Sequence, residues 1–165
     1  MYDPAGDNEG YLRRANPEDI PDLARHHREM FEEIREQTGN PVDLSVLAAL
    51  GNEYIVKLAR EIPSGTCIAW VVQRGDRIVS SGAVSIVSYV PVPHDLSSRI
   101  AFLHSVYTEK EYRHLHYARK ITDEAARYCR EQRIRRLYLF ASEAGRPVYE
   151  EAGFIPVSNT MLLLQ

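Results

Sequence analysis

Apolar residues in the first half of the chain recur at the three- and four-residue spacing that is typical of helices. The first series follows Asn16-Pro17 and two acidic residues, which favours a helix start, and it stops before Thr38-Gly39. A second series follows Asp43 and stops before Pro63-Ser64-Gly65. Two consecutive helices are therefore expected. Their apolar stripes would consist of Ile20, Leu23, Ala24, His27, Phe31 and Ile34 in the first, and of Leu44, Leu47, Leu50, Tyr54, Ile55, Leu58 and Ile62 in the second.

Runs rich in β-branched residues predict strands, since these side chains pack well on a pleated sheet. The runs 66–73 and 77–90 are joined by Arg74-Gly75-Asp76, a connection of hairpin length, so they should pair antiparallel. Further strands are expected at 11–15, 99–108 and 136–141, with one or two closing strands between 154 and 164.

A third helical series lies between the strands predicted at 99–108 and 136–141. It carries Ala118, Ile121 and Ala125 on one face. A succession of strand, helix and strand implies a parallel crossover, here inside a sheet whose other connections are antiparallel. A short last helix is expected over 143–152.

The composition fits one globular domain over 1–165, with residues 1–10 expected to be flexible. The 165 residues are 44% hydrophobic and 26% charged, which is enough apolar material for one core. A net charge of −3 lacks the basic excess of nucleic-acid-binding proteins, so no nucleic-acid partner is expected. Residues 1–10 lack the features of a secretory signal, and every apolar run is far shorter than the ~20 residues that span a bilayer. We therefore expect a cytoplasmic protein without a membrane segment, whose Cys67 and Cys129 are reduced and buried.

The stretch from Tyr112 to Arg119 joins the strand at 100–108 to the next helix. Backbone N–H groups in the first turn of a helix lack intrahelical partners, and the helix dipole adds positive charge there. Such a turn suits a phosphate or a pyrophosphate, with Arg113 as the cation. The alternative is an ordinary charged surface turn.

A second informative stretch runs from Leu139 to Phe154 and contains Ser142 and Tyr149. The two stretches together resemble the GNAT N-acetyltransferase superfamily, whose acyl-CoA loop reads Arg/Gln-x-x-Gly-x-Gly/Ala and whose C-terminal part often has Ser or Asn, a short helix bearing Tyr, and then Gly-Phe. The resemblance implies an α/β (α+β) fold with a mixed, mostly antiparallel sheet of six to seven strands, about four helices, and a splayed parallel pair at strands 4 and 5. In this chain His116 stands where the family loop has its central glycine.

The resemblance also implies acetyl-CoA as the acyl-donor cosubstrate. Its pyrophosphate would lie against the backbone N–H groups of residues 114–118, and its pantetheine arm would bond free backbone groups near Val106 and Thr108. Glycine at the central loop position allows close approach, whereas His116 in ordinary helical geometry would still donate its N–H. The residues implied in cofactor binding are Val106, Tyr107, Thr108, Arg113, His114, Leu115, His116, Tyr117, Ala118 and Ser142.

Acetyl transfer to an amine needs a base for the amine proton and an acid for the leaving thiolate. The resemblance implies Tyr149 as the acid; alternatively its ring belongs to the core and its hydroxyl to the rim. His104 is the candidate base, because it lies on strand 4 and histidine accepts protons near neutral pH. If its side chain faces the other way, it is a half-buried histidine, and Glu143 or water would act instead. Ser142 would either bond the pantetheine or cap the short helix.

No metal site is expected, because the adjacent His26 and His27 point about 100° apart on a helix and do not easily share an ion. Neither histidine is given a chemical role. The sequence thus favours an N-acetyltransferase that passes an acetyl group directly from acetyl-CoA to an amine of an unidentified small molecule or peptide. The alternative is a catalytically weak or inactive module of the same fold that binds CoA or another ligand as a sensor or interaction domain. A homodimer whose C-terminal strands pair across subunits is a third interpretation.

Overall fold

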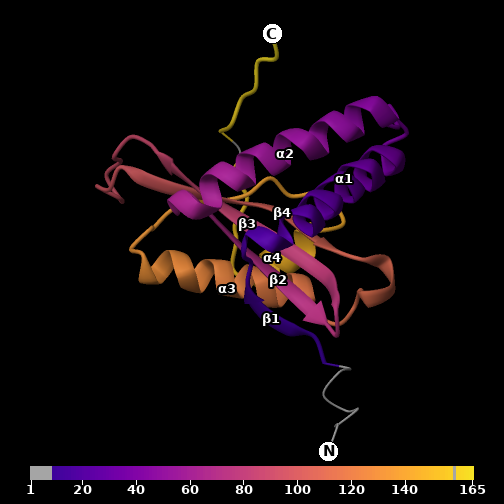
Figure 1. Ribbon diagram of the computed structural model, residues 1–165. Coiled ribbons are helices and arrows are strands. Elements are labelled where there is room, and N and C mark those ends of the chain that lie inside the picture. Colours follow the sequence, from indigo (N-terminus) through magenta and orange to yellow (C-terminus); the bar gives the residue numbers. More distant parts are fainter. Residues whose placement is uncertain (1–8, 158) are drawn as a thin grey trace, which may run out of the picture.

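The structure, a computed structural model, describes residues 9–157 and 159–165, which form three layers (Figure 1). Helices α1 and α2 cover one face of a mixed sheet, and α3 and α4 cover the other. The four predicted helices are confirmed within these residues. In chain order the elements are β1 (Tyr11–Arg14), η2 (Pro17–Asp19), α1 (Ile20–Gln37), α2 (Leu44–Ser64), β2 (Cys67–Arg74), β3 (Arg77–Ser88), β4 (Arg99–Thr108), η3 (Lys110–Tyr112), α3 (Tyr117–Glu131), β5 (Leu137–Tyr138) and α4 (Arg146–Glu151).

The sheet has the strand order β1-β2-β3-β4-β5 within the described residues. Neighbouring strands are antiparallel except β4 and β5, so the predicted parallel pair is confirmed. That pair contains two residue pairs, Ala101 with Leu137 and Phe102 with Tyr138. Beyond Phe102, β4 therefore has β3 on one side and no described strand on the other. This open edge of β4 determines where the candidate site lies.

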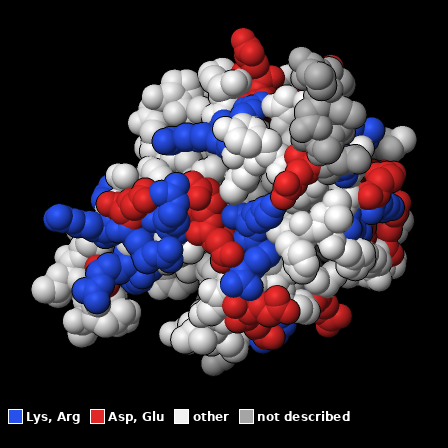
Figure 2. All heavy atoms as spheres, turned by 90° about the horizontal axis from the view of Figure 1, so that it is seen from below, with Lys and Arg blue, Asp and Glu red and all other residues white. Residues whose placement is uncertain are grey.

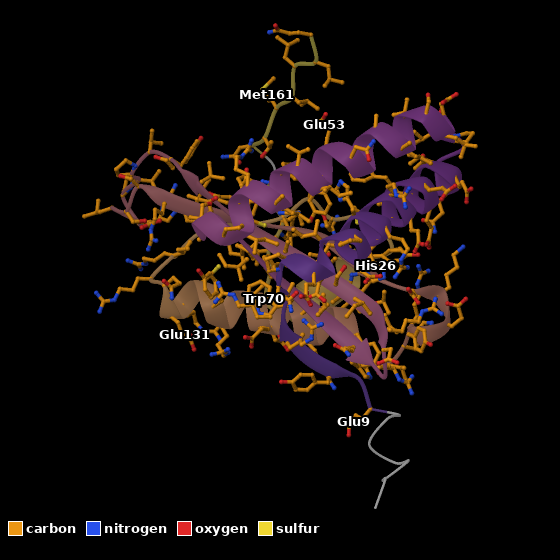
Figure 3. The ribbon with its side chains drawn as sticks, viewed as in Figure 1. Glu9, His26, Glu53, Trp70, Glu131 and Met161 are labelled. Atoms are coloured by element: carbon orange, nitrogen blue, oxygen red, sulfur yellow. The ribbon has the colours of Figure 1, made fainter. Side chains whose placement is uncertain are left out.

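The prediction of six to seven strands is wrong for the described residues, which contain five. The closing strands were expected between 154 and 164, where the described residues form no strand. Pro156 has no N–H group for a ladder, and the side chains from Met161 to Leu164 are 81–97% exposed on a tail that runs away from the domain (Figure 3). A strand here would need an apolar face packed on the domain, and these side chains pack on none of the described core.

The fifth strand is also shorter than the predicted range 136–141. It ends at Tyr138, and Phe140 beyond it is 83% exposed. The buried Arg136, which precedes the strand, donates from Nε to Oδ2 of the buried Asp95 at 2.6 Å. This ion pair ties the connection between β3 and β4 to the start of β5.

The flexible segment predicted at 1–10 lies mostly outside the described residues, which begin at Glu9. Gly10 is buried, and its N–H donates to the Tyr117 hydroxyl at 3.2 Å. A Cβ at Gly10 would come within 2.6 Å of Val72, so the close approach here requires glycine.

Each face of the sheet has its own apolar core. Trp70 packs between the sheet and α3, and His26 lies between α1 and the sheet (Figure 3). Cys67 and Cys129 are buried free thiols, as predicted, and burial raises the pKa of each to about 11. The core under α1 and α2 includes Leu23, Tyr54, Leu58, Val71 and Ala83, and the core under α3 includes Ile68, Val84, Leu103, Ala125 and Cys129.

The face seen from below the sheet carries charges of both signs. Figure 2 shows basic and acidic side chains next to each other over this face. On α3, Arg119 pairs with Asp123, and Arg127 pairs with Glu124 and Glu131. Within the described part of the chain, every helix is too short or too polar to cross a bilayer.

Candidate active site

A β-bulge interrupts β4 at the level of Ser105. Ser105 and Val106 have no registered partner in β3, where the pairing shifts across Gly82. Ser105 has φ 56°, in the left-handed region that costs a non-glycine residue about 1–2 kcal/mol. A Cβ at Gly82 would come within 2.7 Å of Ile121, so glycine lets α3 approach the sheet beside the bulge. Bulges of this kind often redirect a strand next to an active site.

The open edge of β4 begins just before this bulge. Its last pairing with β5 is at Phe102, so the edge from residue 103 to Thr108 faces no described strand. An extended chain can add to such an edge. Within this edge the Thr108 carbonyl is already engaged, because it accepts a hydrogen bond from Arg113 Nε at 3.0 Å. The neighbouring Tyr107 carbonyl accepts one from the Ser80 hydroxyl at 2.8 Å.

His104 faces the α1 and α2 layer rather than the α3 layer. Its Nε2 lies 2.8 Å from Ser85 Oγ, and its Nδ1 lies 2.9 Å from Ser105 Oγ. Burial lowers the pKa of His104 to about 4, so the ring is neutral at pH 7. Both ring nitrogens have partners, so His104 as a direct base would have to give up one of these hydrogen bonds.

His27 joins this group from α1, although no chemical role was predicted for it. Its Nδ1 lies 2.8 Å from Ser105 Oγ, and its ring stacks on Tyr54 with centroids 4.0 Å apart. Burial lowers the pKa of His27 to about 4. The available signal was its place in the apolar stripe of the first helix, because a histidine there points inward and needs a polar partner.

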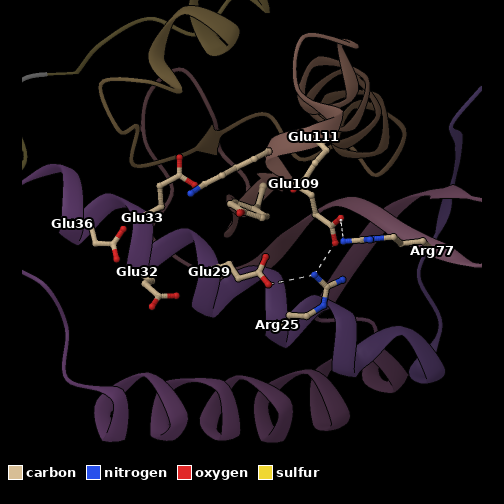
Figure 4. Close-up of a pocket in the computed structure, with 10 residues that line it drawn as sticks. Arg25, Glu29, Glu32, Glu33, Glu36, Arg77, Glu109 and Glu111 are labelled. Atoms are coloured by element: carbon tan, nitrogen blue, oxygen red, sulfur yellow. Dashed lines mark hydrogen bonds and ion pairs between the residues drawn. The ribbon is translucent and has the colours of Figure 1, made fainter.

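A carboxylate missed by the sequence reasoning, Glu109, lies at the end of β4 (Figure 4). Its carboxylate oxygens form ion pairs with Arg25 and Arg77, each with a nitrogen–oxygen distance of 2.7 Å. His26 Nε2 lies 3.3 Å from one of these oxygens. Burial raises the pKa of the Glu109 carboxyl, but the hydrogen bonds from these three side chains outweigh it and hold the pKa below its usual range.

The Glu109 network borders a cavity of about 410 Å³ between α1, the end of β4 and η3. Acidic side chains of α1 dominate its wall, as Figure 4 shows for Glu29, Glu32, Glu33 and Glu36. Such a wall repels phosphates. The cavity therefore does not suit the pyrophosphate of a nucleotide cofactor.

The loop before α3 contains two left-handed residues, His114 with φ 65° and His116 with φ 62°. The expectation that His116 has ordinary helical geometry is therefore wrong: the backbone has the conformation that glycine favours. His114, Leu115 and His116 are exposed, whereas Tyr117 is buried. Within the described residues no side chain caps α3, so the N–H groups of its first turn remain available to an anion.

Arg113 connects this loop to α1. Its NH1 and NH2 groups donate to the two carboxylate oxygens of Glu33 at 2.8 and 2.7 Å. The hydrogen bonds from Arg113 hold the pKa of the Glu33 carboxyl below its usual range. In this arrangement Arg113 fixes the loop, and to contact a phosphate it would have to exchange part of this pairing.

Tyr149 of α4 packs its ring against Phe154, with centroids 6.0 Å apart and ring planes at 70°. Its hydroxyl bonds to none of the described residues. Burial raises the pKa of Tyr149, so the phenol keeps its proton at neutral pH. Ser142 has a local partner, because its Oγ accepts the Gly145 N–H at 3.1 Å in the turn before α4. This separate turn is why α4 begins at Arg146 instead of the predicted 143.

Replacing His116 by glycine should stabilise the fold, because glycine adopts φ 62° without steric cost. We expect the free energy of unfolding in urea to rise by about 0.5–1 kcal/mol. Lys120→Gly is the matched control: it lies inside α3, and there glycine should cost about 1 kcal/mol. An equal loss of stability in both variants would contradict the left-handed geometry at His116.

Comparison with known proteins relates this arrangement to a family. A model of the acetyltransferase (GNAT) family matches residues 20–154. No curated protein matches the sequence significantly.

Similar solved structures include a predicted acetyltransferase with acetyl-CoA from Clostridium acetobutylicum, with a TM-score of 0.82 and 20% identity over 94% of this chain and 96% of that one. A GCN5-related N-acetyltransferase from Ralstonia eutropha JMP134 has a TM-score of 0.83 and 20% identity over 94% and 99% of the two chains. The aminoglycoside N-acetyltransferase AAC(6')-Iy in complex with CoA has a TM-score of 0.68 and 13% identity over 95% of each chain. At these identities the likenesses show the fold.

Proposed function

The chain belongs to the acetyltransferase (GNAT) family, and on that premise we propose that it transfers an acetyl group from acetyl-CoA directly to an amine of a small molecule or peptide. The observation that carries the proposal is the uncapped start of α3 beside the open edge of β4. The helix start offers N–H groups to an anion, and the edge offers backbone groups to an extended chain. Acetyl-CoA has both a pyrophosphate and an amide-bearing arm.

The pyrophosphate would lie at the first turn of α3, against N–H groups of residues 116–119. The left-handed backbone of His116 keeps its side chain exposed and preserves the glycine-like path of the loop. The pantetheine arm would follow β4 towards the bulge at Ser105. The acidic cavity beside Glu109 would remain free of the cofactor.

Direct transfer needs donor and amine held in attack geometry, which can supply about 7–11 kcal/mol of the barrier. Tyr149 would protonate the departing thiolate, because its phenol carries a proton at neutral pH. A covalent intermediate on cysteine has no support, since burial raises the pKa of both thiols to about 11 and a thiol is a weak nucleophile.

The alternative is a module that binds CoA without efficient catalysis, and His116 is the residue that favours it. Titration calorimetry with acetyl-CoA, followed by an assay of thiol release with added amines, separates the two. The enzyme requires binding and amine-dependent thiol release. Binding with no release from any amine in a broad panel would favour the module. No binding at millimolar concentration would contradict the enzyme and leave only a module that binds another ligand.

Replacing Arg113 by alanine should weaken acetyl-CoA binding at least tenfold, because a charge near the pyrophosphate is lost and the loop loses its tie to α1. Pantetheine, which lacks the pyrophosphate, should lose little affinity in the same calorimetric titration. Glu33→Gln is the matched variant: it loosens the ion pair but keeps the cation, so acetyl-CoA affinity should be retained or increased. Equal losses for acetyl-CoA and pantetheine in Arg113→Ala would show that the arginine acts through loop structure instead.

A further inference from the structure

Ser105 connects two histidines that come from different layers of the fold. Its Oγ lies 2.8 Å from His27 Nδ1 on α1 and 2.9 Å from His104 Nδ1 on β4. The chain of hydrogen bonds continues from His104 Nε2 to Ser85 Oγ on β3, 2.8 Å away. One consistent proton arrangement has His27 donating to Ser105, Ser105 donating to His104, and His104 donating to Ser85. In that arrangement Nε2 of His27 carries a free lone pair.

Nε2 of His27 is the unbonded end of this chain of hydrogen bonds. It makes no hydrogen bond to the described residues. The His27 side chain belongs to a half-buried residue of α1. Tyr54 stacks on one face of the ring and Phe31 contacts it edge-on, with centroids 5.0 Å apart. These two aromatic contacts fix the position of the ring.

Ser105, whose hydroxyl joins the two histidines, lies on the open edge of β4, at the bulge. Its left-handed backbone is strained for a serine, and a strained residue persists where surrounding contacts determine its position. Here those contacts are the hydrogen bonds of its hydroxyl to the two histidines. A donor chain that follows the open edge would bring its thioester to this bulge, one hydroxyl group away from His27.

We propose that His27 is the base that accepts the proton of the attacking amine, and that Ser105 and His104 are positioning residues that hold its ring in the required tautomer. This inference rests on the proposed function. The amine nitrogen bonds to the thioester carbonyl carbon, and the carbon–sulfur bond breaks as the carbonyl re-forms. The amine proton moves to Nε2 of His27, and the thiolate takes a proton from Tyr149. His27 then releases its proton to solvent, and Tyr149 takes one up.

Ser105→Gly is the sharpest test, because it removes the hydroxyl while glycine relieves the backbone strain at φ 56°. With acetyl-CoA and ethanolamine as probes, we expect kcat to fall about 10²-fold or more, while the melting temperature is retained or rises and the calorimetric Kd for acetyl-CoA stays within threefold. A purely structural role for Ser105 predicts no loss of kcat. An unchanged kcat in this variant would overturn the proposal.

His27→Asn tests the base itself, because the asparagine amide can still bond Ser105 but cannot take up a proton. We expect a similar loss of kcat with ethanolamine and a much smaller loss with hydroxylamine, a weakly basic amine that gives up its proton more easily to water. The double variant should be no worse than either single one, since the residues act as a unit. Equal losses with both amines, or losses that multiply in the double variant, would count against His27 as the base.

Ser81→Ala is the matched control. Ser81 Oγ on β3 lies 2.8 Å from Nδ1 of His26 on α1, a buried serine–histidine contact that shares no hydrogen bond with His27 among the described residues. This variant should lose stability and keep kcat. The outcomes separate the two proposals: absent acetyl-CoA binding in the wild type contradicts the proposed function, whereas normal binding with unaltered kcat in Ser105→Gly and His27→Asn contradicts the role of His27.

Discussion

Replacing Tyr149 by phenylalanine should lower the turnover number about 10²- to 10⁴-fold while leaving the dissociation constant of acetyl-CoA nearly unchanged. The substitution removes the phenolic proton and keeps the ring, which packs against Phe154. Because the hydroxyl bonds to none of the described residues, its loss should leave no buried group unsatisfied. Stability should therefore change little, and the loss should fall on the protonation of the thiolate.

The measurement is steady-state thiol release together with single-turnover kinetics, so that chemistry and product release are distinguished. Tyr128→Phe is the matched control, since Tyr128 is a partly buried tyrosine that packs on the same core from α3. It should retain full turnover. If Tyr149→Phe acetylates at the wild-type rate when chemistry limits turnover, Tyr149 has no part in the mechanism.

The order of helices and strands could be predicted because it depends on local pattern. Apolar spacing indicated α1 and α2, and the hairpin length at Arg74-Gly75-Asp76 indicated how β2 and β3 pair. The prediction of closing strands was wrong because a β-rich composition indicates that a segment could form a strand. It does not indicate whether a sheet edge is available to pair with that segment. Residues 161–164 are apolar and exposed, so composition alone misled the prediction there.

The candidate site could be predicted in part. The resemblance to the family suggested the loop and Tyr149, and their roles stay predictions. The conformation of His116 could not be predicted, because positive φ is uncommon in any residue other than glycine. The bulge at Ser105 lies opposite Gly82, where the close approach of Ile121 leaves no room for a Cβ, and these contacts join residues far apart in sequence. For the same reason the sequence could not name Ser105 as the partner of His27, although the place of His27 in the apolar stripe indicated that it needs a polar partner.

Lowering the pH from 6.5 to 4 should destabilise the fold strongly, and the buried histidines are the cause. Burial lowers the pKa of both His27 and His104 from 6.5 to about 4. Between these values the unfolded chain binds protons that the folded chain does not, so the free energy of unfolding falls as pH falls. Each histidine should contribute a slope of up to about 1.4 kcal/mol per pH unit, a large effect against a typical stability of about 5–15 kcal/mol.

The buried Asp95 acts in a lower pH window than the histidines. The hydrogen bond from Arg136 lowers the pKa of Asp95 from 3.8 to about 2, so its stabilising effect is present above pH 4 and is lost between about 4 and 2. Urea unfolding at pH 7, 6 and 5 therefore reports mainly on the histidines. His27→Asn should reduce the pH dependence of the free energy of unfolding over this range. The reduction should correspond to about one proton fewer taken up on unfolding, because one buried imidazole is removed. A wild-type stability that stays constant from pH 7 to 5 would mean that His27 and His104 are not held neutral by the fold.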